Sequence, residues 1–255
     1  MNILIIGTGQ RANGYIKNIL SMKLDNIHFY IHDIDEKRSR FFKKKLDERT
    51  KTESFIIKNI RDITTSIDLV FICTPDNTHY KIFKLISTLC KNIVLEKPMC
   101  LTLNECNNII KLKNENNLNI FIPFVLRYSN FFKKIKELIN TIGEITHFYY
   151  KTSLDFKHTA SYYRRWHRKR ENSGGLLLTK GCHDIDMIHF LLSIGYNEKY
   201  SFGNIKTFEK TNMMGDNCSK CQYKCDYRFN NGYVFMTDSD TNNPINFDKC
   251  IFKND

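Results

Sequence analysis

The chain has 255 residues, of which 42% are hydrophobic and 13% aromatic, with 39 Lys and Arg against 27 Asp and Glu. This composition can fill an interior, which excludes a disordered or collagen-like chain and allows one large domain or two modest ones. The net charge of +12 is divided equally between residues 1–122 and 123–255, so we expect no nucleic-acid partner. There is no apolar run of the roughly 18 residues that a membrane helix needs and no signal peptide, so we expect a soluble, cytoplasmic protein with no membrane partner.

The first half of the chain alternates short apolar runs with helical patterns. The runs of strand length are residues 3–6, 27–31, 68–73, 93–95 and 120–124. The helical patterns between them are residues 11–22, 35–49, 77–90 and 104–116. Buried strands that alternate with helices predict a doubly wound parallel sheet of the Rossmann type, an α/β fold.

The pattern changes after Pro123. A helix is expected at residues 131–139 and another at 183–192, with strand-like segments at 145–152, 200–208 and 233–236. We therefore predict two domains, residues 1–122 for the nucleotide and residues 123–255 as an α+β substrate and oligomerisation domain. The chain reaches residue 255 without a further clear strand, so the second sheet is either incomplete or unusually small.

Glycines follow the first strand and open the first helix. Gly7 permits a tight turn, and Gly9 lets the backbone approach a pyrophosphate at the helix N-terminus. Asp33 follows the second strand, where a carboxylate accepts a hydrogen bond from a ribose hydroxyl, although it could instead cap the next helix. The pattern predicts a dinucleotide site that prefers NAD, with NADP also possible because Arg38 is close.

Four motifs, each modest alone, occur in order along the chain. They are Gly7-Thr8-Gly9 with Arg11 and Gly14, Ile72-Cys73-Thr74-Pro75 through Tyr80, Leu95-Glu96-Lys97-Pro98-Met99, and Ser173-Gly174-Gly175 followed by His183-Asp184-Ile185-Asp186. Together they resemble the Gfo/Idh/MocA oxidoreductases, a family that contains glucose–fructose oxidoreductase and inositol dehydrogenase. The resemblance implies a cofactor domain, then a domain with an open, mostly antiparallel sheet.

The resemblance also implies the chemistry and the residues that carry it. The reaction is hydride transfer between a nicotinamide and a hydroxyl-bearing carbon of a sugar, aminosugar or cyclitol. The residues implied at the cofactor are Gly7, Gly9, Gln10, Arg11, Asp33, Thr74, Pro75, Asn77, His79, Glu96, Lys97, Arg165 and Trp166. The residues implied at the substrate are Lys97, Arg127, Tyr128, Thr179 and His183.

Lys97 and His183 are the expected catalytic pair. Oxidation of an alcohol needs a base near the hydroxyl proton, and histidine titrates in the useful range. Asp186 lies three residues after His183, so both can face one side of a helix. Many family members carry an aspartate four residues before this histidine, where this chain has Thr179, which cannot tune a pKa as an anion would.

A basic segment and a group of cysteines leave alternatives open. Residues 164–170 contain five Arg or Lys side chains around Trp166 and are either a cofactor and substrate contact or a solvated loop. Cys218, Cys221 and Cys225 are a weak candidate metal site, with Cys250 a fourth ligand, but only one C-x-x-C pair is present, so we expect no metal. Cys73, Cys90, Cys100 and Cys106 are expected as small buried hydrophobes.

Two other functions compete with a dehydrogenase. One is an NAD-dependent glycoside hydrolase of the same family, which oxidises, eliminates and re-reduces with no net redox change. The other is a non-catalytic NAD(P)-binding sensor or an inactive fragment, suggested by Thr179 and by the short second half. An incomplete sheet would expose an edge, which favours a homo-oligomer through the C-terminal sheet.

Overall fold

A computed structural model describes residues 1–155, 158–159, 162, 166–193, 195, 198 and 200–203 of the chain. The chain divides into two compact units between Pro123 and Phe124. The expected strand at 233–236, most of the one at 200–208, the cysteines from Cys218 onward and Arg165 lie outside the described residues.

The first unit is built on a six-stranded parallel sheet in the order β3-β2-β1-β4-β5-β6. Its strands are β1 (Asn2–Ile6), β2 (His28–His32), β3 (Ser54–Ile56), β4 (Leu69–Ile72), β5 (Asn92–Leu95) and β6 (Asn119–Phe121). Because β1 is central, its side chains are buried on both faces, and Ile5 pairs with Ile31 on one side and Phe71 on the other. The predicted doubly wound α/β sheet is confirmed.

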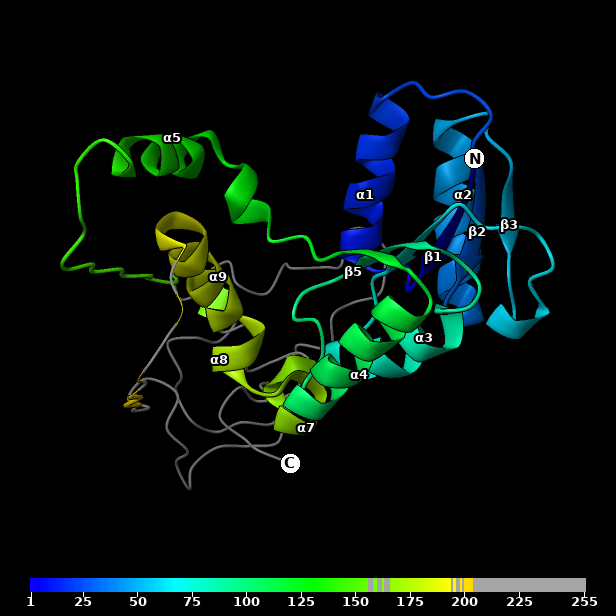
Figure 1. Cartoon of the computed structure of the whole chain (residues 1–255). Helices are drawn as coiled ribbons and strands as arrows, with labels where there is room; N and C mark the ends of the chain where they lie inside the picture. The colour runs from blue at the N-terminus through cyan, green and yellow to red at the C-terminus, as the bar shows by residue number, and fades with distance from the viewer. Residues whose placement is uncertain are drawn as a thin grey trace, which may run out of the picture. The chain divides into compact units, whose positions relative to one another are not determined.

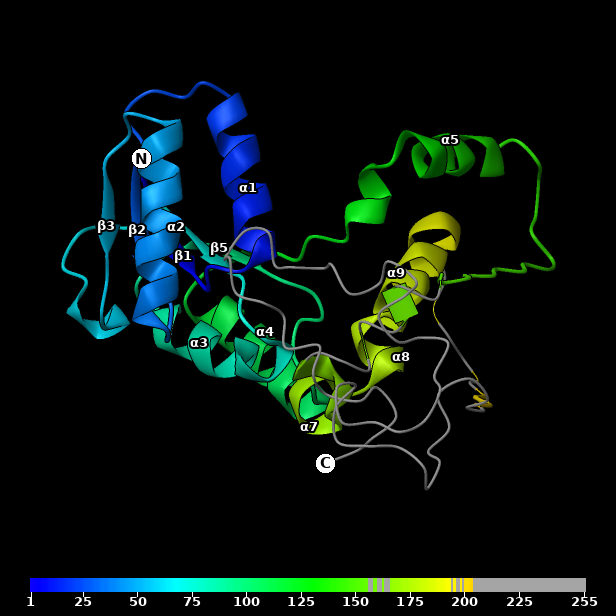
Figure 2. The same ribbon diagram turned by 180° about the vertical axis from the view of Figure 1, so that it is seen from behind.

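Helices cover both faces of this sheet (Figure 1). On one face, α1 (Gln10–Ser21) and α2 (Glu36–Arg49) bury apolar side chains at helical spacing against Ile3 and Ile5. On the other face, α3 (His79–Ile86) and α4 (Leu103–Glu115) pack against Leu4 and Ile6. Figure 2 shows the same two layers of helices from behind.

Most predicted boundaries in the first unit lie within one residue of the observed ones, and there are three larger differences: a strand that was not predicted, a shorter helix and a shorter strand. The three-residue strand β3 was not predicted, because so short a run carries no period and follows a polar segment. The helix expected at 77–90 is shorter, since a 3-10 turn, η2 (Asp76–Thr78), precedes α3 and the helix ends at Ile86. Strand β6 ends at Phe121, two residues before Pro123, which has no N–H to donate.

The regular structure in the described part of the second unit is helical. It contains α5 (Asn130–Ile139), α7 (Arg170–Ser173), α8 (Leu176–Thr179) and α9 (Gly181–Leu192), with 3-10 turns η3 (Val125–Tyr128) and η4 (Trp166–Arg168). The prediction of a strand at 145–152 is wrong for the described part of the chain, where this segment has no neighbouring strand to complete a ladder. Within the described ranges, no helix is long and apolar enough to cross a membrane.

Burial of the α2 face predicts a large stability effect at Leu46, which is 2% exposed. Leu46→Ala should lower the free energy of unfolding by about 2–5 kcal/mol, because the deleted methyl groups leave a cavity in the core. Leu103→Ala is the matched control, since Leu103 is 76% exposed at the start of α4 and should change stability by less than about 0.5 kcal/mol. Urea unfolding followed by circular dichroism measures both, and equal effects would contradict the assigned core.

Candidate functional site

The turn after β1 has a backbone that only glycine suits. Gly7 has φ of +88°, and a Cβ atom there would lie 2.7 Å from the carbonyl oxygen of Cys73 and 2.8 Å from Cγ2 of Thr74. Gly9 is the N-cap of α1, and the nearest atom to a Cβ placed there is 3.7 Å away, on Arg38. No side chain of the described residues caps this helix, so its first amides can face an anion.

Asp33 is fixed at the carboxyl end of β2 by the glycine turn. Its Oδ2 accepts hydrogen bonds from the backbone N–H and the hydroxyl of Thr8, each at 2.7 Å. The cap of α2 is Asp35, whose carboxylate accepts from the Lys37 N–H, so the alternative that Asp33 caps this helix does not hold. Arg38 places Nε 3.8 Å from Asp33 Oδ2 and partly neutralises the carboxylate.

His79 connects two turns of the first unit. It is fully buried, with Nδ1 2.8 Å from the carbonyl oxygen of Pro98 and Nε2 3.0 Å from that of Thr74. Both ring nitrogens therefore face protein carbonyls. The structure places this side chain as a link between the Thr74 and Lys97 turns rather than as one open to a ligand.

The turn after β5 carries Lys97, and the Lys97–Pro98 peptide bond is cis. Glu96 beside it is only 7% exposed, and its Oε1 accepts a hydrogen bond from the Tyr15 hydroxyl and lies 3.3 Å from Arg11 Nε. Burial and the hydrogen bond to Glu96 raise the pKa of Tyr15 well above its ordinary value, so this hydroxyl stays protonated as a donor. Glu96 thus ties the Lys97 turn to α1.

The first unit brings its predicted residues to one edge of the sheet. The glycine turn, the Thr74 turn and the Lys97 turn follow β1, β4 and β5, which are adjacent parallel strands. Their carboxyl ends lie together, and this is the edge at which open parallel sheets bind ligands. Asp33, at the end of β2, lies on the other side of β1.

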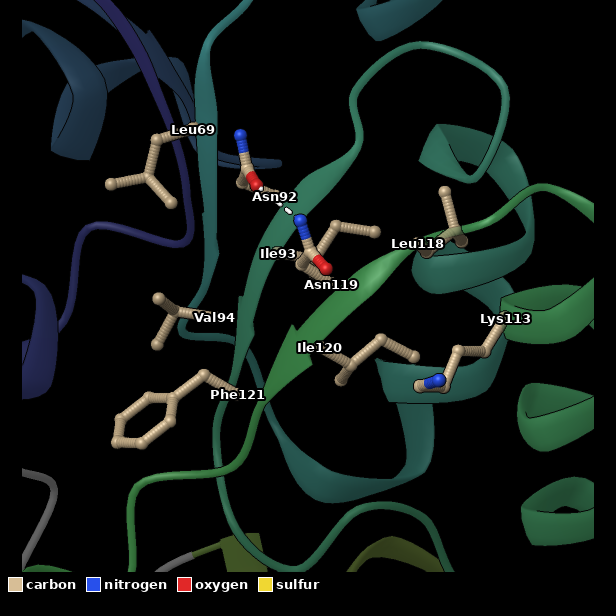
Figure 3. Close-up of a pocket in the computed structure, with 9 residues that line it drawn as sticks. All are labelled: Leu69, Asn92, Ile93, Val94, Lys113, Leu118, Asn119, Ile120 and Phe121. Carbon is tan, nitrogen blue, oxygen red and sulfur yellow. Dashed lines mark hydrogen bonds between the residues drawn. The ribbon is translucent and has the colours of Figure 1, made fainter.

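A cavity of about 390 Å³ lies elsewhere, against β4, β5 and β6 (Figure 3). It includes the first residues of two strands, Asn92 and Asn119, whose side-chain amides are hydrogen-bonded at 3.0 Å. Leu69, Val94 and Phe121 project to one side of the sheet in this view. Its lining residues include none from the glycine, Thr74 or Lys97 turn, so it is separate from the part of the edge that carries those turns.

In the second unit, His183 and Thr179 are both buried. His183 lies on α9 with 8% exposure, and its ring meets the ring of Phe124 edge-on with centroids 5.9 Å apart. Thr179 is the last residue of α8 and is 3% exposed. Sequence spacing correctly predicted a helix that carries His183 and did not predict the separate turn of α8.

Arg127 forms an ion pair with Asp186, a pairing that the sequence did not predict. Arg127 donates from Nε and Nη2 to the two carboxylate oxygens of Asp186 at 2.8 and 2.6 Å, and its guanidinium lies over the Phe190 ring. The hydrogen bonds to Asp186 raise the pKa of Arg127. Two nitrogens of the Arg127 guanidinium are thus bonded to Asp186, while its side chain keeps 36% exposure, and its role as a substrate contact stays a prediction. The neighbouring Tyr128 is 56% exposed.

The described part of the basic segment is a folded turn. Trp166 begins η4, is 40% exposed and stacks on His167 with ring centroids 4.8 Å apart. Ser173 is fully buried, and its hydroxyl donates to the His167 carbonyl oxygen at 2.7 Å. This segment therefore differs from a fully solvated loop over residues 166–173.

Comparison with known proteins identifies both halves of the chain. Residues 1–124 match a family model described as "Oxidoreductase family, NAD-binding Rossmann fold", and residues 136–241 match one described as "Oxidoreductase family, C-terminal alpha/beta domain". YteT, a Bacillus subtilis protein named as an oxidoreductase, is 30% identical over 217 residues, which are 81% of this chain and 50% of YteT. Myo-inositol 2-dehydrogenase from Thermotoga maritima is 29% identical over 85% of this chain and 62% of that protein.

Solved structures share the fold at lower identity. Scyllo-inositol dehydrogenase from Lactobacillus casei, solved with NAD(H) and scyllo-inositol, has a TM-score of 0.59 and 22% identity over 78% of this chain and 60% of that one. Myo-inositol 2-dehydrogenase from Lactobacillus plantarum also has a TM-score of 0.59, with 20% identity over 76% of this chain and 56% of that one. The chain spans between half and two thirds of the length of the curated relatives named above.

The lack of space for a Cβ atom at Gly7 predicts that substitution there will impair the turn proposed to hold the nucleotide. Gly7→Ala should weaken NADH binding at least tenfold and cost at least about 1–2 kcal/mol of stability from the left-handed backbone alone. Gly14→Ala is the matched control, because Gly14 lies on α1 and a Cβ atom there would have nothing within 4 Å. This substitution should raise the free energy of unfolding by about 0.5–1 kcal/mol. Fluorescence titration with NADH and urea unfolding measure the two effects; unchanged NADH affinity in Gly7→Ala would refute the turn's assignment.

The Arg127–Asp186 pair predicts measurable coupling within the second unit. A cycle of Arg127→Met, Asp186→Asn and the double variant should give about 1 kcal/mol of interaction energy, modest because Arg127 is 36% exposed. Lys134 and Glu137, each 66% exposed, form the control pair, with coupling below about 0.5 kcal/mol expected. Unfolding free energies measure both cycles, and equal couplings would show that Asp186 does not anchor η3 to α9.

Proposed function

This chain belongs to the Gfo/Idh/MocA oxidoreductase family, and on that premise we propose that it transfers hydride between NAD(P) and a hydroxyl-bearing carbon of a sugar, aminosugar or cyclitol. The observation that carries the proposal is the convergence of three turns, after β1, β4 and β5, at one edge of the sheet. A glycine turn at the end of a central strand suits a pyrophosphate, and a lysine on a neighbouring turn suits proton transfer.

The first unit fits a nicotinamide dinucleotide. The space around Gly9 and the uncapped start of α1 suit the pyrophosphate, and Asp33 suits a ribose hydroxyl. Gln10, Arg11 and the Thr74-Pro75 turn with Asn77 are proposed as further cofactor contacts. When bound, the nicotinamide supplies the site that accepts or returns hydride.

Lys97 and His183 are proposed to handle the proton of the substrate hydroxyl. Lys97 is held by its neighbours, since Glu96 is tied to α1 and the Pro98 carbonyl is held by His79. His183 is carried on α9, which the Asp186 carboxylate anchors to Arg127 of η3. Thr179 is proposed to hydrogen-bond the substrate, and the absence of a carboxylate at this position leaves the proton to Lys97 and His183.

A cyclitol is the substrate class we favour. The support comes from relatives whose names specify inositol, among them the Thermotoga maritima enzyme. Tyr128 and Trp166, each partly exposed, are proposed to contact the ring or the cofactor with their flat faces. Assembly into a homo-oligomer and a cytoplasmic location stay predictions.

Lys97 provides the test of this assignment. Lys97→Ala should lower turnover with NAD and an inositol by about 10²–10⁴-fold, because it removes a proton-transfer group, while NADH affinity stays within about twofold. Lys111→Ala is the control, since Lys111 is 71% exposed and pairs with Glu115 on α4. The assay follows reduced nicotinamide absorbance across a panel of inositols and sugars.

Two outcomes would contradict the dehydrogenase assignment. Full turnover in Lys97→Ala would remove the lysine from the mechanism. Cleavage of a chromogenic glycoside without net NADH formation would support the glycoside hydrolase alternative instead.

A further inference from the structure

Two cysteines after the Lys97 turn have their sulfur atoms in contact. Sγ of Cys100 lies 3.1 Å from Sγ of Cys106, closer than an ordinary contact between two thiols, and the sulfurs are unbonded. Cys100 is 3% exposed, whereas Cys106 is partly exposed. We expected both as small buried hydrophobes, which is wrong for the partly exposed Cys106, and a pair in this arrangement can do more.

The local structure holds the two sulfurs in place. Thr102 is the N-cap of α4 and forms a capping box with Glu105, whose carboxylate also accepts from the Leu101 N–H at 3.1 Å. The Thr102 carbonyl oxygen accepts from the Cys106 N–H at 3.0 Å and from the Cys100 thiol at 3.6 Å. The Thr102 carbonyl thus holds the Cys106 backbone and the Cys100 thiol at one point, and the sulfurs would have to close from 3.1 Å to about 2.05 Å to bond.

We propose that Cys100 and Cys106 are a redox-active dithiol that forms an intramolecular disulfide by exchange with a small-molecule disulfide such as oxidised glutathione. The site is independent of the oxidoreductase activity proposed above. It lies in the loop that continues from Pro98, so the disulfide fastens the segment after Lys97 to the first turn of α4.

The exchange proceeds in two balanced steps. Cys106 loses its proton, and its thiolate attacks one sulfur of oxidised glutathione, breaking that disulfide and releasing one glutathione thiolate, which takes up a proton. Cys100 then loses its proton and attacks the Cys106 sulfur, releasing the second glutathione, which is protonated in turn. Two protein thiols are oxidised, and one glutathione disulfide is reduced to two thiols.

The order of attack follows from burial. Desolvation, followed by the contact with Cys106, raises the pKa of Cys100 far above that of a free thiol, so its thiolate is scarce. Cys106 is the more accessible sulfur and is therefore the one that meets the oxidant. Cys100, already in contact, acts as the resolving thiol.

Peptide mapping of the full chain tests the proposal. After treatment with oxidised glutathione and alkylation of the remaining thiols, mass spectrometry should find a Cys100–Cys106 crosslink, lighter by two hydrogens, in more than half of the molecules, and dithiothreitol should reverse it. Cys100→Ser should stop at a glutathione adduct on Cys106, since the resolving thiol is gone. Cys90→Ser is the control and should leave the crosslink unchanged, because the Cys90 thiol donates to the Asn92 carbonyl oxygen instead.

Two results would overturn the proposal. One is that, in the unsubstituted protein, Cys100 and Cys106 are both alkylated after treatment with oxidised glutathione. The other is a stable glutathione adduct on Cys106 of the parent protein, which would show that Cys100 does not resolve it. Neither readout depends on a substrate, so a failed search for turnover would leave this test intact.

Discussion

The parallel hydrogen-bond ladder of the sheet continues one step past the strands at their carboxyl ends, and the candidate cofactor site depends on this continuation. At the three turns these bonds are Gly7 N–H to His32 O at 2.8 Å, Cys73 N–H to Ile6 O at 2.8 Å and Glu96 N–H to Ile72 O at 3.1 Å. Because each turn begins in register with its neighbour, the glycine, Thr74 and Lys97 turns meet at one edge. The apolar residues on both faces of β1 hold that register, since a slip of one residue would reverse which side chains are buried against each layer of helices.

Buried polar groups complete this edge. Burying a carboxylate is unfavourable unless it is paired. Glu96 is almost fully buried, and the Tyr15 hydroxyl and the Arg11 guanidinium offset the loss of water around it. The fully buried His79 ring places its two nitrogens 2.8 and 3.0 Å from the carbonyl oxygens of Pro98 and Thr74, and whichever nitrogen carries the proton donates to its carbonyl. These contacts join α1, β4 and the turn after β5, so the Lys97 turn is held from two sides by groups that would be expensive to leave unpaired.

The second unit uses an ion pair for a comparable purpose. The bidentate contact between Arg127 and Asp186 joins η3 to α9, and Phe190 lies under the guanidinium. Lys136 of α5 adds a hydrogen bond to the carbonyl of Leu191 near the C-terminal end of the same helix. The helix that carries His183 is therefore fastened at two points along its length. The predicted helices at 131–139 and 183–192 are confirmed, and the pairing of Arg127 with Asp186 was not predicted from the sequence.

By itself, the sequence determined the strands and helices of the first unit other than β3, the glycine turn, the acid after β2 and the lysine turn after β5. These signals are local: apolar runs, a backbone that tolerates only glycine, and the residue types that follow a strand. Tertiary structure alone decided the partners of polar side chains that pair across long stretches of sequence. Tyr15 and Glu96 are 81 residues apart, and Arg127 and Asp186 are 59 apart, so no local pattern pairs them. Even Cys100 and Cys106, six residues apart, are paired by the loop and cap that bring their sulfurs together. Partner choice depends on where packing places side chains, which local propensity does not specify.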